Sequence, residues 1–120
     1  MINFITHPSY DKEIAALKPR FQNLAKGIDA FKRLASIQFH PKRPQSIIAP
    51  GKLHRLHQND IWAIWKVEVA VKGVRSNKSP RLWFAIKGSE MVFLCIATHE
   101  NNYNDEKVKE VAISRVTDFF

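Results

Sequence analysis

The chain has 120 residues, of which 45% are apolar, and a formal net charge of +8, so we expect one domain spanning residues 1–120 with a single core. No apolar run approaches the roughly 18 residues of a membrane-spanning helix, and residues 1–6 lack the features of a signal peptide, which excludes both readings. The single cysteine excludes a disulfide framework and predicts a reducing, cytoplasmic location.

The positive charge is unevenly distributed. Residues 12–87 contain 16 Lys and Arg against 4 Asp and Glu, a balance of +12, whereas residues 88–120 contain 3 against 6. A basic body with a mildly acidic tail favours a polyanionic partner such as nucleic acid. The alternative is ordinary solubility charge.

The first forty residues predict a short strand and two helices. Residues 2–6 are typical of a strand that Pro8 ends, and Ser9 is the expected cap of a helix over residues 9–18. Pro19 fits the first position of a second helix. The apolar stripe of that helix recurs at i+3 and i+4 and consists of Phe21, Leu24, Ile28, Phe31 and Leu34. We expect an antiparallel helical pair on the apolar face of a sheet.

The middle of the chain predicts irregular structure and then three strands. Prolines at 41 and 44 forbid a helix, and residues 52–56 are compatible with an extended segment. β-Branched and aromatic residues dominate residues 61–71, 81–86 and 91–97, which predict three consecutive antiparallel strands. Residues 87–90 form a tight hairpin loop, and residues 73–80 form a basic connection.

The C-terminal residues predict a last helix. Asn104 is a good cap, and Asp105 and Glu106 follow in the first turn, where carboxylates suit the helix dipole. The apolar stripe would be Val108, Val111, Ala112 and Val116. The predicted order is β-α-α-β-β-β-α, an α+β domain with its helices gathered on one side of a mainly antiparallel sheet.

Strand alternation sorts the side chains of the three strands into two faces. The apolar face would carry Trp65, Val67, Val69 and Val71, then Leu82, Phe84 and Ile86, then Val92, Leu94 and Ile96. The other face would carry Lys66, Glu68, Arg81, Trp83 and, by extrapolation, His99, together with Phe93, Cys95 and Ala97. Because a slip of one residue reverses a strand's faces, this gathering depends on register.

The gathered face has the groups that metal-independent RNA cleavage by the 2′-hydroxyl requires. Glu68 or Lys66 would take the 2′ proton, and Arg81 would bind the phosphate through its planar fork. His99 would serve as acid or base, and Tyr103 or Trp83 would stack on a base. The alternative is a set of unrelated surface and packing residues.

Other chemistry is not indicated. His54-x-x-His57 lacks the partners of a metal site, so we expect two solvent-facing histidines and no metal. There is no glycine-rich phosphate loop. Nothing near Cys95 would lower its pKa, so we expect an inert residue of the sheet.

The order of features, with Trp65-Lys66-Val67-Glu68-Val69, Pro80-Arg81-Leu82-Trp83-Phe84-Ala85, and Phe93 to His99 leading to Tyr103, resembles the RelE/ParE superfamily of bacterial toxins. The resemblance implies a RelE/ParE-like fold and the toxin component of a type II toxin–antitoxin system. It implies catalytic roles for Arg81, Lys66, His99 and Tyr103, with Glu68 as the weakest match. Expected RNA contacts are Trp83, Lys72, Arg75, Lys78, Lys87 and Arg55.

The expected activity is an endoribonuclease, or mRNA interferase, that cleaves mRNA on the ribosome and causes growth arrest. Its partners would be mRNA, the 70S ribosome and a separate antitoxin protein, with no cofactor and no membrane. Two alternatives remain open: a gyrase-inhibiting toxin of the ParE type, and a non-catalytic basic nucleic-acid-binding module. The sequence leaves codon preference and oligomeric state undetermined.

Overall fold

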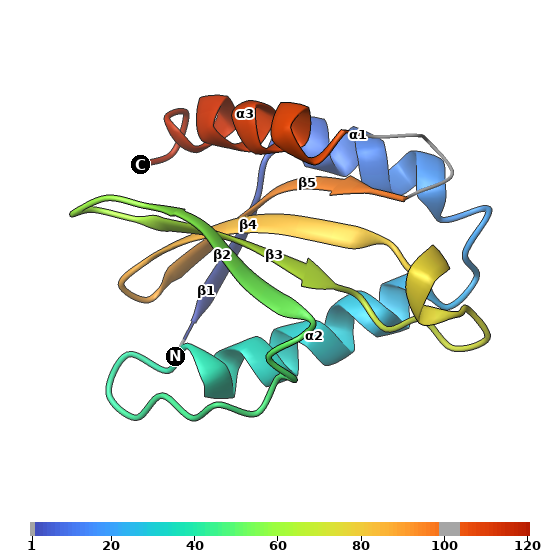
Figure 1. Cartoon of the computed structure of the whole chain (residues 1–120), viewed down its shortest axis with the longest axis horizontal. Helices are drawn as coiled ribbons and strands as arrows, with labels where there is room; N and C mark the ends of the chain where they lie inside the picture. Colours follow the sequence, from blue (N-terminus) through green and yellow to red (C-terminus); the bar gives the residue numbers. More distant parts are fainter. Residues whose placement is uncertain (1, 99–103) are drawn as a thin grey trace.

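The computed structural model describes residues 2–98 and 104–120, which form a five-stranded sheet and three α-helices (Figure 1). The elements in chain order are β1 (Asn3–Thr6), α1 (Pro8–Leu17), α2 (Leu24–Gln38), β2 (Leu53–Gln58), β3 (Ala63–Glu68), β4 (Arg81–Lys87), β5 (Glu90–Ala97) and α3 (Asp105–Val116). The predicted α+β class is confirmed. Within these described ranges, no helix has the length and apolar character needed to cross a membrane.

The sheet is mixed and has five strands, one more than the sequence predicted. Its strand order is β1-β5-β4-β3-β2, in which β1 runs parallel to β5 and every other neighbouring pair is antiparallel. The extra strand is β2, for which the sequence indicated only an extended segment at residues 52–56. As an edge strand it buries a single side chain, Leu53, so it lacks the apolar run that identified its neighbours.

The helices lie on both faces of the sheet, which corrects the prediction that they gather on one side. Figure 1 shows α2 below the sheet and α3 above it. The reason is that both faces carry apolar side chains. One cluster includes Phe84 and Phe93 with α2, and a second includes Trp83 and Leu94 with the buried side of α3.

The N-terminal helices differ in detail from the prediction. α1 ends at Leu17 and α2 begins only at Leu24, with Asn23 at the cap position, so Pro19 does not start the second helix. α1 lies beside β5 beyond the end of β1, where the Glu13 carboxylate accepts a hydrogen bond from the Ile96 amide at 3.2 Å. The Glu13 carboxylate thus supplies the hydrogen-bond acceptor that a neighbouring strand would otherwise offer to the Ile96 amide.

A bulge in β5 overturns the predicted faces of this strand. Phe84 pairs with Phe93 and Trp83 pairs with Cys95, so Leu94 is the extra residue between two paired positions. Ile96 therefore faces the α2 side as predicted, whereas Val92 and Leu94 face α3. An inserted residue reverses the alternation of the strand at that point.

The last helix matches its predicted cap. The Asn104 side chain accepts hydrogen bonds from the amides of Glu106 and Lys107. Ala112 and Val116 are buried, but Val111 is 40% exposed and does not belong to the packed stripe.

Gly27 lies where α2 closely approaches the chain that follows β3. A Cβ atom built on Gly27 would lie 2.6 Å from the carbonyl oxygen of Ala70 and 3.2 Å from Cγ1 of Val69. Because the nearer atom belongs to the backbone, α2 would have to move away from the sheet to make room.

The substitution Gly27→Ala is therefore expected to lower the free energy of unfolding by about 1–3 kcal/mol, the usual cost of overpacking. Helix propensity alone predicts the opposite sign, a gain of about 1 kcal/mol. Urea unfolding measures the difference, with Ala25→Gly on the exposed side of the same helix as the control. A Gly27→Ala protein that is more stable than the parent would contradict the close approach.

Candidate active site

Strands β2, β3 and β4 bring polar side chains into two adjacent cross-strand rows. In one row His54 lies opposite Lys66, which lies opposite Trp83. In the next row Glu68 lies opposite Arg81. Residues two apart along a strand share a face, and Trp83 packs with α3, so both rows face α3. The predicted phase of β3 and β4 is confirmed.

A hollow of about 200 Å³ lies over these rows. Its lining combines three cationic side chains, two carboxylates and one imidazole, contributed by Gly51, Lys52, His54, Lys66, Glu68, Arg81 and Asp105. The structure thus brings together three of the predicted catalytic residues, Lys66, Glu68 and Arg81. We call this space the polar hollow.

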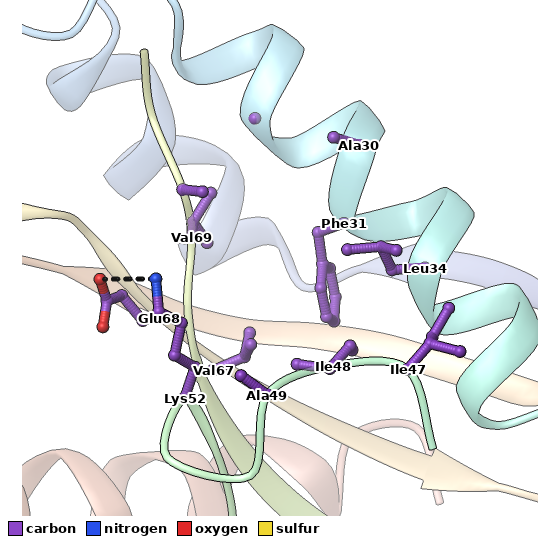
Figure 2. Close-up of a pocket in the computed structure, with 12 residues that line it drawn as sticks. Ala30, Phe31, Leu34, Ile47, Ile48, Ala49, Lys52, Val67, Glu68 and Val69 are labelled. Atoms are coloured by element: carbon purple, nitrogen blue, oxygen red, sulfur yellow. Dashed lines mark ion pairs between the residues drawn. The ribbon is translucent and has the colours of Figure 1, made fainter. Parts of the chain in front are cut away.

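The Glu68 side chain is largely enclosed within the polar hollow. Its side chain is 11% exposed, and its Oε1 accepts a hydrogen bond of 2.5 Å from the Ser76 hydroxyl. The Nζ of Lys52 lies 3.8 Å from the same oxygen, an ion pair drawn in Figure 2. A carboxylate whose orientation is fixed is placed to accept a proton from a hydroxyl bound in the polar hollow.

Lys66 pairs with the first residue of α3. Its Nζ lies 3.2 Å from Oδ1 of Asp105 and 6.0 Å from the ring centroid of Trp83. The Lys66 side chain is 20% exposed, whereas that of Asp105 is 61% exposed. Asp105 is therefore an internal anion with which any anionic ligand would compete for Lys66.

Replacing Asp105 with asparagine is expected to tighten the binding of a non-cleavable oligonucleotide by about two- to fivefold, the scale of a weak exposed ion pair. Removal of the carboxylate leaves Lys66 to the phosphate. Fluorescence anisotropy at low salt measures the affinity, and Glu106→Gln, one residue further along, controls for the change in net charge. Equal tightening by both variants would show that only net charge matters.

Arg81 is held by the chain that precedes its strand. Its Nη1 donates hydrogen bonds to the carbonyl oxygens of Ser79 and, at 3.3 Å, of Ser76. Both bonds are donated by Nη1, and the Nη2 and Nε donors take no part in them. The planar fork of Arg81 is thus fixed in orientation while retaining donors suited to a phosphate.

Trp83 does not have the role that the sequence predicted for it. Its side chain is fully buried in the cluster beneath α3, so the ring offers no surface on which a base could stack. Arg55 lies over the ring of Trp65 at 5.8 Å, on the other face of the sheet. Lys87 lies at the opposite end of β4 from Arg81, near Phe120. None of the three reaches the polar hollow.

The other predicted RNA contacts are exposed. Lys72, Arg75 and Lys78 belong to the connection between β3 and β4, which contacts Glu68 of the polar hollow through Ser76. His99 and Tyr103 lie outside the described residues, so their predicted roles stay predictions.

Sequence reasoning missed Lys52 and His54 as members of the site. Both depend on β2, whose pairing places His54 opposite Lys66 and the Lys52 carbonyl against the amide of Glu68. A polar edge strand gives no periodic apolar signal, so the sequence indicated only an extended segment at residues 52–56. Across residues 2–98 and 104–120, no group of three or more His, Cys, Asp or Glu side chains is arranged to hold a metal ion.

A second polar cluster, formed by Arg115 of α3 and Glu13 of α1, has a structural role. The guanidinium of Arg115 contacts both carboxylate oxygens of Glu13 at 3.0 Å and donates to the Leu94 carbonyl at 2.7 Å, which ties α3 to α1 and β5. Cys95 is buried there, and its burial raises the pKa of the thiol to about 12. The thiol is protonated at neutral pH, in keeping with an inert sheet residue.

An apolar groove of about 160 Å³ lies between α2 and the chain at residues 67–70 (Figure 2). Its walls include Phe31, Leu34 and Ile47, and Lys52 and Glu68 are the charged residues at its margin. Because the polar hollow gathers more charged side chains than this groove, the polar hollow is the candidate active site.

Comparison with known proteins gives no relative for this chain: no family model, no curated protein and no solved structure matches it. What the structure establishes is an α+β domain with a five-stranded mixed sheet, carrying a polar hollow on its α3 face.

Proposed function

We propose that this chain is an RNA-cleaving toxin of the RelE/ParE type, the toxin component of a type II toxin–antitoxin system. The observation that carries the proposal is the polar hollow, where Glu68 lies among Lys52, Lys66 and Arg81. Cleavage of RNA by its own 2′-hydroxyl needs a proton acceptor and cations around one phosphate. The net charge of +8 supports a polyanionic substrate.

In the proposed reaction the 2′ oxygen forms a bond to the adjacent phosphorus, and the bond from phosphorus to the 5′ oxygen breaks. Glu68 takes the proton of the 2′-hydroxyl, while Arg81 and Lys66 stabilise the charge on the non-bridging oxygens. An imidazole protonates the departing 5′ oxygen. His54 lines the polar hollow, and His99 is the candidate from sequence. The products are a 2′,3′-cyclic phosphate and a 5′-hydroxyl.

The proposed partners follow from this activity. The substrate is mRNA, presented in the A site of the 70S ribosome. The antitoxin is a separate small protein that covers the basic face with acidic or amphipathic segments. A short reading frame adjoining the gene, encoding such a protein, would support the toxin class.

The test is cleavage by the purified protein. It is incubated with programmed ribosomes and mRNA, and primer extension maps the new ends. The proposal predicts discrete cleavages with cyclic phosphate termini, and no cleavage where the nucleotide 5′ to the scissile phosphate carries a 2′-deoxy sugar.

The alternatives give different results in the same preparation. Intact mRNA with inhibition of purified gyrase would replace the proposal by a gyrase-inhibiting toxin. Intact mRNA with salt-sensitive RNA binding and harmless expression would replace it by a non-catalytic binding module.

A further inference from the structure

The connection between β3 and β4, residues 69–80, is a folded element whose sequence suggested only a basic protrusion. Residues Ser76–Lys78 form a 3₁₀ turn. Ser79 is 2% exposed, and its hydroxyl donates to the Arg75 carbonyl at 2.9 Å. The Pro80 carbonyl accepts from the Val69 amide at 2.9 Å, which fixes the end of the connection to the chain after β3.

Within this connection Ser76 contacts both a carboxylate and a guanidinium of the polar hollow. Its hydroxyl donates to Oε1 of Glu68 at 2.5 Å. Its carbonyl oxygen accepts from Nη1 of Arg81 at 3.3 Å. One residue therefore contacts the proposed proton acceptor and the proposed phosphate-binding cation.

These contacts matter because Glu68 and Arg81 are directly opposite each other on β3 and β4. Opposite charges at directly opposed positions ordinarily attract each other. In the part of the chain that the structure describes, however, no ion pair joins them: Glu68 is paired with Lys52, and Arg81 is bonded to backbone carbonyls. Ser76 supplies a different partner to each group.

We propose that Ser76 is a positioning residue that keeps Glu68 and Arg81 from neutralising each other and leaves both directed at one phosphodiester. The inference rests on the proposed ribonuclease function and deepens it. Without the hydroxyl, the Glu68 carboxylate turns to Arg81. The carboxylate is then a poorer proton acceptor, and the guanidinium fork is occupied by an internal anion.

The test compares Ser76→Ala, Ser76→Thr and, as the matched control, Asn77→Ala in the same exposed turn. Cleavage kinetics and side-chain NMR are measured on each, following the ¹⁵Nε resonance of Arg81 and the ¹³C carboxyl resonance of Glu68. We expect Ser76→Ala to lower kcat by about tenfold with KM changed less than about twofold, since one hydrogen bond to a charged group is lost. Ser76→Thr, which keeps the hydroxyl, should restore kcat to within about threefold.

The two readouts separate failure of the positioning role from failure of the proposed function. If the parent protein cleaves RNA and Ser76→Ala leaves both kcat and the two resonances unchanged, the positioning role is overturned. If Ser76→Ala only raises KM, Ser76 is a binding contact and the proposal is again wrong. If the parent protein does not cleave RNA, the proposed function fails, and the NMR alone decides whether Ser76 positions the two groups. Joint shifts of the Arg81 and Glu68 resonances in Ser76→Ala but not in Asn77→Ala support the positioning role. Unchanged resonances overturn it.

Discussion

Replacing Arg81 with alanine is expected to lower the rate of RNA cleavage by a factor on the order of 10²–10³, the usual effect of removing one preorganised stabiliser of transition-state charge. Arg81 lines the polar hollow, and two carbonyl oxygens orient its guanidinium. Arg81→Lys keeps the charge but loses the planar fork, so it should recover only part of the rate. Single-turnover cleavage of a ribosome-bound mRNA measures the effect.

The matched control is Arg33→Ala, which removes one exposed cation from α2, on the other side of the sheet. It should leave the cleavage rate within about twofold. Thermal unfolding of each variant shows whether loss of the Arg81 hydrogen bonds has disturbed the connection. A folded Arg81→Ala protein that retains more than about a tenth of the parent rate would remove the main support for the ribonuclease proposal.

Replacing Trp83 with alanine is expected to lower the free energy of unfolding by about 3–5 kcal/mol, the range for a large aromatic side chain deleted from a core. Trp83 lies fully buried on the central strand β4, in the cluster that includes Ala112 and Val116 of α3. The deletion would leave a cavity between the sheet and α3. Urea unfolding followed by circular dichroism measures the loss.

Trp83→Phe separates packing from RNA contact, because it keeps an aromatic ring of smaller volume. It should cost less stability than the alanine variant and should leave affinity for RNA unchanged, since the ring at this position does not reach the polar hollow. Ile61→Ala, at a side chain that is 56% exposed, is the control and should change stability by less than about 0.5 kcal/mol. An alanine variant with parental stability and lost RNA binding would restore the base-stacking role.

One feature of the site followed from the sequence through strand alternation. The polar residues of β3 and β4 alternate with Val67, Leu82 and Phe84, and this placed Lys66, Glu68 and Arg81 on one face, where the structure has them. The alternation is reliable here because β3 and β4 pair in continuous register from end to end.

Other features could not be obtained from local pattern. The face on which the sequence gathered the polar residues is in part a second core, where Trp83 packs against α3. The bulge at Leu94 has no local signal, since every residue from Met91 to Ile96 is buried and both phases are apolar. β2 depends on pairing with a strand already in place, and with it Lys52 and His54 enter the site.

The sequence by itself determined the α+β class, the helix cap at Asn104, the phase of β3 and β4, and the basic character of the chain. Only the tertiary structure decided that α3 covers the polar face, that Asp105 meets Lys66, and that Ser76 comes between Glu68 and Arg81. The physical reason is the range of the forces. Alternation and capping depend on neighbouring residues, whereas the pairing of charges across 39 positions, as in Lys66 and Asp105, depends on how the sheet and helices pack.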